Sequence, residues 1–428
     1  MKIHKNCSPD NWGHLLDRPG LETREIEPQV QVVLDAVKTR KDEALYDYTR
    51  QFDGVELSSL RVSAEEMAAG ETLDESLKAA IIQAGTNITA FHQAQTEQVV
   101  VVETMPGVRC WRRSVPIEKV GLYAPAGSAP LFSTVLMLGI PARLAGCPQI
   151  VLCSPPGKDG KIHPAILFAA ALVGIDQVFK VGGIQAIAAM AYGSESIPRM
   201  DKIFGPGNQY VTMAKQLVNR QGVAIDMPAG PSEVLILADS TADPGFVAAD
   251  LLAQAEHGPD SQCILVSTSE ALIERVRQEV ARQLESTPRR EIAEKALQNC
   301  RLIYMADPLR AMDFTNAYAP EHLIIMTADP LADGLRIRNA GSVFLGAMAP
   351  VSVGDYASGT NHTLPTNRGA VAYGGVSLDS FVKKITFQNI SADGLRNIGP
   401  IVTTMARAEH LVAHSNAVSI RLNSINAR

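Results

Sequence analysis

The 428-residue sequence lacks the features that mark membrane, secreted and nucleic-acid-binding proteins. It has no run of 18 or more apolar residues, and its first residues contain no apolar segment of the signal-peptide type. The six cysteines are scattered without a Cys-x-x-Cys pair, which argues against disulfides and a thiolate zinc site. The net charge is −6 and Lys and Arg form no block. We therefore expect a cytoplasmic protein that binds a small molecule and neither nucleic acid nor a membrane.

What the sequence does contain is a regular alternation of short apolar runs with helical segments. Between residues 120 and 237 the runs are VGLY, QIVLCS, VFKVGG, DKIFG, VAID and EVLILA, and the rhythm continues with QCILVS, RLIYM, HLIIM and GSVFLG. Strands that are apolar throughout and separated by helices are typical of a parallel sheet covered on both faces. A chain of this length also needs more than one core. The sequence predicts an α/β protein with two doubly wound, Rossmann-like units, a short N-terminal segment and a helical C-terminal tail.

The domain boundaries follow from where these patterns change. Apolar positions at helical spacing occupy residues 28–52 and 63–95, and residues 99–117 have the alternation and the Pro-Gly turn of a β-hairpin. Residues 1–23 are polar and do not have the pattern of a core element. We expect an N-terminal segment (1–23), a discontinuous first α/β domain that shares one sheet (24–122 with 233–376), a second α/β domain (123–232) and a C-terminal tail (377–428).

Two glycine turns are the first candidates for nucleotide binding. The G-x-G-x-x-G fingerprint of dinucleotide-binding folds is absent, but VGGIQAIA (181–188) and FGPGN (204–208) each lie between a predicted strand and a predicted helix. Glycine at such a turn lets a phosphate approach the backbone N–H groups at a helix start. Taken alone the signal is weak, because glycine in strand-to-helix turns is more often plain connection chemistry.

The segment ADPGFVAADLLAQAEHG is the first candidate for metal binding. Asp243 can cap this helix, Pro244 suits its first turn and Gly258 can terminate it. Asp250, Gln254 and His257 would then share one face, and an imidazole and an amide oxygen one turn apart can reach a single divalent ion such as zinc. The alternative, which an isolated Gln/His pair favours, is a solvated helix face.

Three further segments carry candidate functional groups. Glu321 and His322 precede an apolar strand and offer two adjacent proton-transfer groups. Residues 352–370 form a long polar segment that is predicted to be a functional loop, with Asp355 as its best anionic ligand. In the tail, His410 and His414 are spaced so that they could chelate a metal. Each of these segments has a simpler interpretation as exposed polar surface.

Taken together, these motifs carry a family resemblance. The blocks IDMPAGPSEV, DLLAQAEHGPDSQ, YAPEHL, AGSVFLG, GDYASGTNHTLPT and AHSNAV occur in an order that resembles the bacterial histidinol dehydrogenases, and the similarity extends over nearly the whole chain. Several long motifs in the correct order are more specific than any one of them. The simpler interpretation of each isolated motif is therefore outweighed by the set.

The resemblance implies a function for each matching position. It implies one zinc ion per subunit held by Gln254, His257, Asp355 and His414, an acid/base pair of Glu321 and His322, and NAD contacts at Tyr123, Gln185 and Asn208. It implies substrate contacts at Ser232 and Glu409, in addition to His322 and the metal ligands. It also implies a homodimer whose tails complete each other's sites, and the oxidation of L-histidinol through L-histidinal to L-histidine in histidine biosynthesis.

The sequence alone leaves other functions open. The chain could be a related dehydrogenase acting on another amino alcohol or a diol, or a zinc hydrolase in which Glu321 activates metal-bound water without NAD. It could also be an α/β protein that binds a ligand without catalysis. His410, one turn from His414, could compete with it as a ligand.

Overall fold

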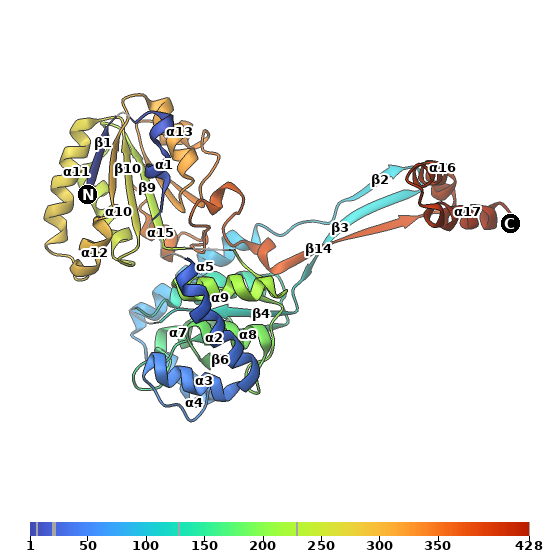
Figure 1. Cartoon of the computed structure of the whole chain (residues 1–428), viewed down its shortest axis with the longest axis horizontal. Helices are drawn as coiled ribbons and strands as arrows, with labels where there is room; N and C mark the ends of the chain where they lie inside the picture. The colour runs from blue at the N-terminus through green and yellow to red at the C-terminus, as the bar shows by residue number, and fades with distance from the viewer. Residues whose placement is uncertain (6, 19–22, 127–128, 228–229, 428) are drawn as a thin grey trace. The chain divides into compact units, whose positions relative to one another are not determined.

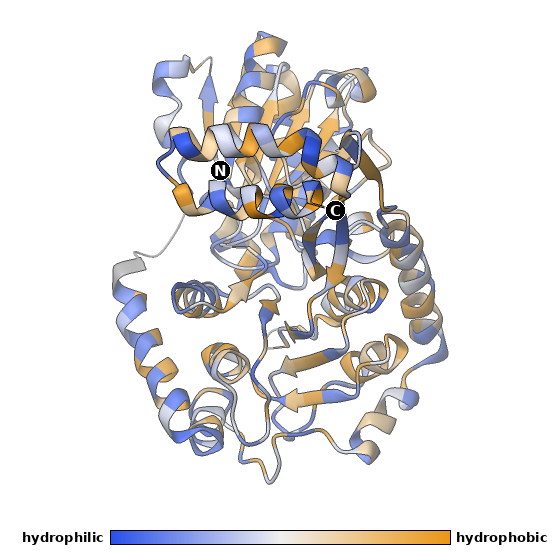
Figure 2. Ribbon diagram, turned by 90° about the vertical axis from the view of Figure 1, so that its right-hand side faces the viewer, coloured by the Kyte–Doolittle hydropathy of each residue, from blue (hydrophilic) through white to orange (hydrophobic). Residues whose placement is uncertain are grey.

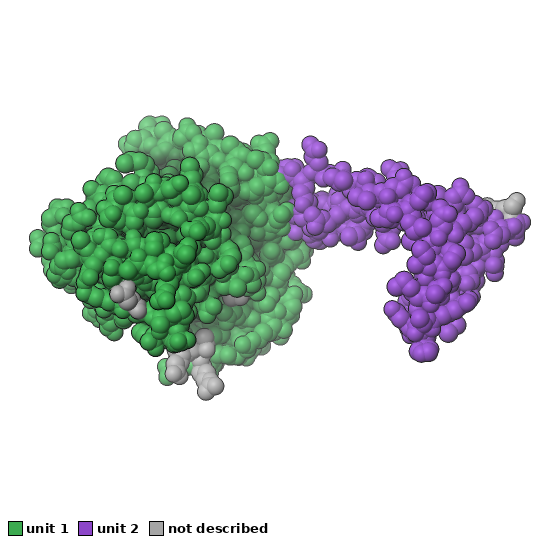
Figure 3. All heavy atoms as spheres, turned by 90° about the horizontal axis from the view of Figure 1, so that it is seen from above, with its two compact units in different colours: residues 1–95, 117–381 green, residues 96–116, 382–428 purple. Residues whose placement is uncertain are grey.

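The computed structural model describes residues 1–5, 7–18, 23–126, 129–227 and 230–427. The chain folds into two compact units, coloured separately in Figure 3: unit 1 comprises residues 1–95 and 117–381, and unit 2 comprises residues 96–116 and 382–428. Unit 1 contains two parallel sheets with their helices, and unit 2 contains an antiparallel sheet and a helix pair. No helix in the described ranges has both the length and the apolar character needed to cross a bilayer.

The first sheet of unit 1 has six parallel strands in the order β1-β11-β10-β9-β12-β13, of which β1, β10 and β9 are labelled in Figure 1. The strands are β1 (Lys2–Lys5), β9 (Glu233–Ala238), β10 (Gln262–Ser267), β11 (Arg301–Tyr304), β12 (His322–Met326) and β13 (Ser342–Leu345). Alternate residues of a strand face opposite sides. Val234 and Ile236 of β9 accordingly pack with α10 (Pro244–Ala255), α11 (Glu270–Leu284) and α12 (Arg290–Leu297), whereas Leu235 and Leu237 pack with α1 (Gly13–Leu16) and α13 (Pro308–Tyr318).

The second sheet has five parallel strands in the order β6-β5-β4-β7-β8. They are β4 (Lys119–Tyr123), β5 (Gln149–Ser154), β6 (Gln177–Lys180), β7 (Lys202–Phe204) and β8 (Ala224–Ile225). Helices α6 (Phe132–Leu144) and α7 (Pro164–Leu172) cover one face, and α8 (Gly183–Tyr192) and α9 (Gln209–Arg220) cover the other. In Figure 2 the strands are largely hydrophobic in colour, as expected for sheets buried on both faces. The two predicted parallel α/β units are confirmed.

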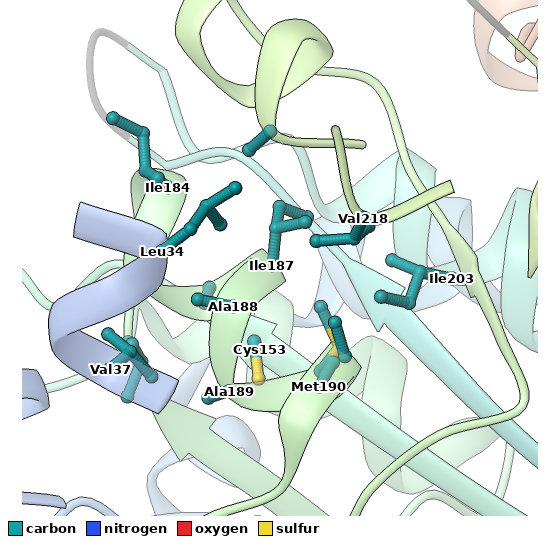
Figure 4. Packing of buried hydrophobic residues seen from close by; sticks show 14 of the residues in the cluster. Leu34, Val37, Cys153, Ile184, Ile187, Ala188, Ala189, Met190, Ile203 and Val218 are labelled. Atoms are coloured by element: carbon teal, nitrogen blue, oxygen red, sulfur yellow. The ribbon is translucent and has the colours of Figure 1, made fainter. Parts of the chain in front are cut away.

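Residues 24–95 differ from the expectation that they share a sheet with residues 233–376. The helices α2 (Thr23–Arg40), α3 (Asp42–Tyr48) and α5 (Glu75–Gln93) pack instead on the helices of the five-stranded sheet. The reason is visible in α8, whose side chains are buried from Ile184 to Ala191. A helix that is apolar on every side needs an outer layer. Leu34 and Val37 of α2 form part of that layer in Figure 4.

The N-terminal segment is also more structured than its polar composition indicated. β1 pairs in parallel with β11 at the edge of the six-stranded sheet, and the side chains of Trp12 and Leu15 are buried in its core. Lys2, His4 and Lys5 are compatible with an edge strand because charged and polar side chains are common at sheet edges. Residues 1–18 therefore belong to the first α/β domain in space.

Unit 2 is built on the predicted hairpin. β2 (Val101–Met105) and β3 (Val108–Pro116) are antiparallel, and Gly107 adopts a φ of 80° in the turn between them. A third strand, β14 (Val382–Ile390), pairs with β3 and was not expected, because residues 377–428 had been predicted to be mainly helical. The sequence pattern did not indicate this strand because lysines interrupt its apolar alternation, which is short. The predicted helical end is present as α16 (Ala392–Ala408) and α17 (Val412–Asn426).

Short helices complete unit 1. The Ser63–Glu66 capping box forms as predicted at the start of α4 (Ala64–Met67). The remaining elements are η1 (Pro9–Asn11), η2 (Thr49–Asp53), η3 (Ala68–Thr72), α14 (Pro330–Gly334), α15 (Val351–Tyr356), η4 (Gly369–Val371) and η5 (Leu378–Phe381).

Candidate functional site

A cavity of about 850 Å³ in unit 1 is lined by residues from the ends of both parallel sheets. From the five-stranded sheet the lining residues follow strands, as ligand-binding residues do in open α/β folds. The lining residues from the six-stranded sheet lie before its strands instead: Ser232 before β9, His257 before β10 and Glu321 before β12. Six of the predicted site residues line this cavity: Tyr123, Gln185, Asn208, Ser232, His257 and Glu321.

The five-stranded side offers two helix N-termini to the cavity. The buried hydroxyl of Tyr123 accepts a hydrogen bond from the N–H of Gly183 at the start of α8 (3.1 Å), and burial raises the pKa of Tyr123 to about 12. Gln185 is 1% exposed, and its Oε1 has no partner among the described residues. Asn208 caps α9 by accepting hydrogen bonds from Tyr210 and Val211. Helix N-termini with glycine turns favour anionic groups such as phosphates.

A buried ion pair holds the FGPGN turn in place. Lys215 and Asp226 pair with side chains that are 5% and 1% exposed, respectively. Lys215 also donates to the carbonyl oxygen of Gly205 (2.9 Å), while the N–H of Gly205 donates to Asp226 (2.8 Å). The pair therefore fixes both backbone polar groups of a glycine whose φ is 139°.

The substitution Lys215→Met is expected to lower the free energy of unfolding by about 3–5 kcal/mol, because it leaves the buried Asp226 carboxylate without its cation. Urea denaturation measures this directly. Arg220→Met on the same helix is the matched control: Arg220 pairs with Glu27 at the surface, where its loss should cost less than about 1 kcal/mol. Equal effects of the two substitutions would contradict the role assigned to Lys215.

Glu321 and His322 lie together at the start of β12, with only 5% and 4% of their surfaces exposed. The backbone of one residue holds both: the N–H of Glu233 donates to Glu321 Oε2 (2.8 Å), and the carbonyl oxygen of Glu233 lies 3.1 Å from His322 Nδ1. A carbonyl oxygen only accepts, so His322 Nδ1 carries the proton in this contact. When the ring is neutral, His322 Nε2 is then its proton acceptor.

The electrostatic surroundings of His322 come from two carboxylates. Its Nδ1 lies 3.5 Å from Glu321 Oε2, and its Nε2 lies 3.4 Å from Asp355 Oδ1. Burial lowers the pKa of His322, but the charges of Glu321 and Asp355 outweigh burial and raise it well above the ordinary value. For Asp355 burial raises the pKa, and the imidazoles of His322, His362 and His257 together lower it. A carboxylate among three imidazoles is suited to binding a cation and to transferring protons.

Two of the predicted metal ligands, Gln254 and His257, lie at the end of α10. Gln254 is 2% exposed, which excludes the solvated-face alternative for this residue, and its amide nitrogen has no partner in the described ranges. The helix ends at Ala255, three residues before Gly258, because the N–H of His257 bonds to the carbonyl oxygen of Gln254 and tightens the last turn. His257 therefore lies just beyond the helix.

Asp355 does not lie in a loop, contrary to expectation. It belongs to α15, which begins after Pro350 and precedes the irregular part of the polar segment. Pro350 is compatible with the position directly before a helix. The sequence did not indicate a helix here because the Gly- and Ser-rich residues that follow are typical of a loop. Asp250 also differs from a solvated residue: it is buried, and burial raises its pKa to about 6.

The donor set can be compared with what zinc requires. Gln254, His257 and Asp355 offer an amide oxygen, an imidazole nitrogen and a carboxylate oxygen, which are donor types that zinc accepts. In the described ranges no three His, Cys, Asp or Glu side chains form a metal-binding group, which is consistent with the predicted set because only two members of these types lie in unit 1. The residues present therefore fit a zinc ion.

His362 is a site residue that the sequence interpretation missed. It lines the cavity, with Nδ1 2.9 Å from the carbonyl oxygen of Asp355 and Nε2 3.3 Å from Thr134 Oγ1. The signal was available, since a single histidine in the GDYASGTNHTLPT block stands seven residues after Asp355.

The two remaining predicted residues belong to unit 2. Glu409 immediately follows α16, and His414 lies in the first turn of α17; both side chains are exposed. His410 between them has a φ of 59°.

Comparison with known proteins decides the family. The model of the family described as histidinol dehydrogenase matches residues 16–422. This chain belongs to the histidinol dehydrogenase family. The histidinol dehydrogenase of Bacteroides thetaiotaomicron is 58% identical over 426 residues, covering 99% of this chain and 100% of that protein. The histidinol dehydrogenase of Vibrio parahaemolyticus is 50% identical over 427 residues, with 99% and 98% covered.

A solved structure agrees with the sequences. The crystal structure of histidinol dehydrogenase from Elizabethkingia anophelis superposes with a TM-score of 0.97 at 52% identity, covering 100% of this chain and 99% of that one. Histidinol dehydrogenases are NAD-dependent, zinc-containing oxidoreductases of histidine biosynthesis. The resemblance read from the sequence motifs is thereby confirmed at the level of the family.

Proposed function

We propose that this protein oxidises L-histidinol to L-histidine in two NAD-dependent steps through L-histidinal. The observation that carries the proposal is the pair Glu321 and His322, which the backbone of Glu233 holds in place. Glu321 lines a cavity that His257 also lines, and His322 Nε2 lies 3.4 Å from Asp355 Oδ1. Family membership supports the choice of substrate, and the adjacent acid and base support the chemistry.

The same cavity is proposed to hold both the metal and the nicotinamide nucleotide. Gln254, His257 and Asp355 would bind zinc, with His414 as the fourth ligand. When bound, zinc would orient the imidazole and amine of histidinol and neutralise the charge of Asp355. Tyr123, Gln185 and Asn208 would contact NAD, which accepts a hydride in each step.

The proposed work of the protein's own residues is proton transfer. His322 Nε2 takes the hydroxyl proton of histidinol as the carbon loses its hydride. Glu321 then takes a proton from the water that adds to the aldehyde, and the hydrated aldehyde loses the second hydride to a second NAD. Ser232 lines the same cavity and is proposed to contact the substrate.

We further propose a homodimer in which Glu409 and His414 of each copy complete the site of the other. The support comes from unit 2 itself, which exposes an unusual number of apolar side chains for so small a unit. They include Val99, Val100, Val101, Val102, Ile401, Val402, Met405, Leu411, Val412 and Ile420. The cytoplasmic location predicted from the sequence stays a prediction.

The decisive experiment is a spectrophotometric assay of NADH formation with L-histidinol and NAD. Turnover should disappear after exhaustive treatment with a chelator and return with added zinc, since metal loss leaves the apoprotein intact but unable to position the substrate. Simple diols tested in parallel address the alternative of another alcohol substrate. No NADH with histidinol at full zinc occupancy would reject the proposal, and faster turnover of a diol would replace the substrate.

A further inference from the structure

A buried ion pair lies directly behind the acid/base pair. Arg18 binds Glu233 through two contacts, Nε to Oε1 (3.2 Å) and Nη2 to Oε2 (3.0 Å). The side chains are 8% and 1% exposed. Burying two charges is costly unless their geometry is good, and a bidentate guanidinium–carboxylate pair is the strongest arrangement available. An ion pair buried in this way is expected to have a structural or functional role, unlike a solvated ion pair at the surface.

Arg18 is presented from a firmly anchored segment. Its guanidinium also donates to the carbonyl oxygen of Tyr318 (2.6 Å) and lies over the Tyr318 ring at 3.7 Å. Arg301 donates to the carbonyl oxygens of Leu15 (2.7 Å) and Asp17 (2.8 Å). The polar N-terminal segment therefore holds one cation at a fixed place in the core.

Glu233 connects this cation to the functional groups. Its carboxylate binds Arg18 and also accepts the N–H of Asn367, which lies in the polar segment that carries His362. Its backbone N–H and carbonyl oxygen hold Glu321 and His322. Arg18 thus reaches the acid/base pair through a single residue.

We propose that Arg18 is a positioning residue for the reaction: through its ion pair with Glu233 it fixes the backbone N–H and carbonyl oxygen of Glu233, which orient Glu321 and His322. The inference rests on the proposed function of that pair. If the guanidinium is removed, the Glu233 carboxylate is left buried without its cation, and the start of β9 with the Glu233 backbone groups can shift. A displacement of about 1 Å in a supporting residue can lower turnover ~100-fold.

The test uses the full-length, zinc-loaded protein with Arg18→Met, Arg18→Lys and Glu233→Gln. We expect kcat to fall ~100-fold in Arg18→Met with KM for NAD and zinc content near wild type, because the NAD and metal residues are not touched. Arg18→Lys keeps the charge but loses the bidentate contact, so it should recover part of kcat. Glu233→Gln keeps the shape and the backbone contacts while weakening the ion pair, and should lie between the two.

Arg301→Met is the matched control for anchoring of the N-terminal segment. It removes the bonds to Leu15 and Asp17 and leaves the ion pair intact, so it should lower the melting temperature and leave kcat within about threefold. If Arg18 had a purely structural role, Arg18→Met and Arg301→Met would both lower the melting temperature, and their kcat values would not differ in this way.

Two results would overturn the inference: a kcat within twofold of wild type in Arg18→Met, or an equal loss of kcat in Arg301→Met. If Arg18→Met does not fold, unchanged kcat in both Arg18→Lys and Glu233→Gln overturns it equally. Absence of histidinol-dependent NADH in the wild type would instead reject the proposed function, so the two failures are distinct.

Discussion

The conversion of L-histidinal to L-histidine should slow by about 10²–10⁴-fold in Glu321→Gln, the usual contribution of a positioned general base. Glutamine has the shape of glutamate and can still accept the N–H of Glu233, so the site should keep its form. It cannot take a proton from water. Binding of histidinol should change far less than turnover. Stopped-flow measurement of NADH formation from histidinol and from histidinal separates the two steps.

Glu279→Gln provides the control for charge removal. Glu279 lies on the outer side of α11 and pairs with Arg282 at the surface, where loss of a carboxylate has little effect. If Glu321→Gln converts histidinal at the wild-type rate, or if it mainly raises KM for histidinol, then Glu321 is not the base that activates water.

Removal of the His257 imidazole is expected to abolish zinc retention and, with it, nearly all turnover. A metal site with one protein ligand missing binds far more weakly, because each ligand contributes to a closed coordination shell. Zinc content after gel filtration, measured by elemental analysis, should be below a tenth of the wild-type value in His257→Ala. NAD binding should persist, since Tyr123 and Gln185 are unchanged.

The tail histidines supply an internal comparison for the same experiment. His414→Ala should lose zinc as His257→Ala does, whereas His410→Ala should retain it. The two residues lie four positions apart, and only His414 is proposed to be a ligand. Full zinc occupancy in His257→Ala would remove that residue from the site. Loss of zinc in His410→Ala alone would transfer the role to His410.

Strand positions were predictable because their cause is local. Runs such as EVLILA and QCILVS carry apolar residues at consecutive positions, as expected for a strand buried on both faces. The same holds for the Ser63–Glu66 capping box and the Asp243 cap of α10, whose side chains bond within a few residues of themselves. β14 was missed because its alternation is weakened by Lys383, Lys384 and Asn389.

Long-range placement was not predictable from local patterns. Nothing in the amphipathic α2 shows which sheet it covers; that depends on α8, more than a hundred residues away, being apolar on every side. The ion pair of Arg18 and Glu233 joins positions 215 residues apart, so no spacing rule could find it. Candidate site residues were identified by motif order, and only the fold brought Glu321, His257 and Ser232 to one cavity.

The two parallel sheets face their shared cavity in opposite senses: one with the ends of its strands, the other with the beginnings. Among the residues that the structure describes, those directly after the strands of the six-stranded sheet, where open α/β proteins usually place their ligands, do not line this cavity. Asp243, Ser269, Asp307 and Asp329 lie there, and each caps a helix. Loops at that end of the sheet can therefore lengthen or accept inserted segments without disturbing the residues that line the cavity.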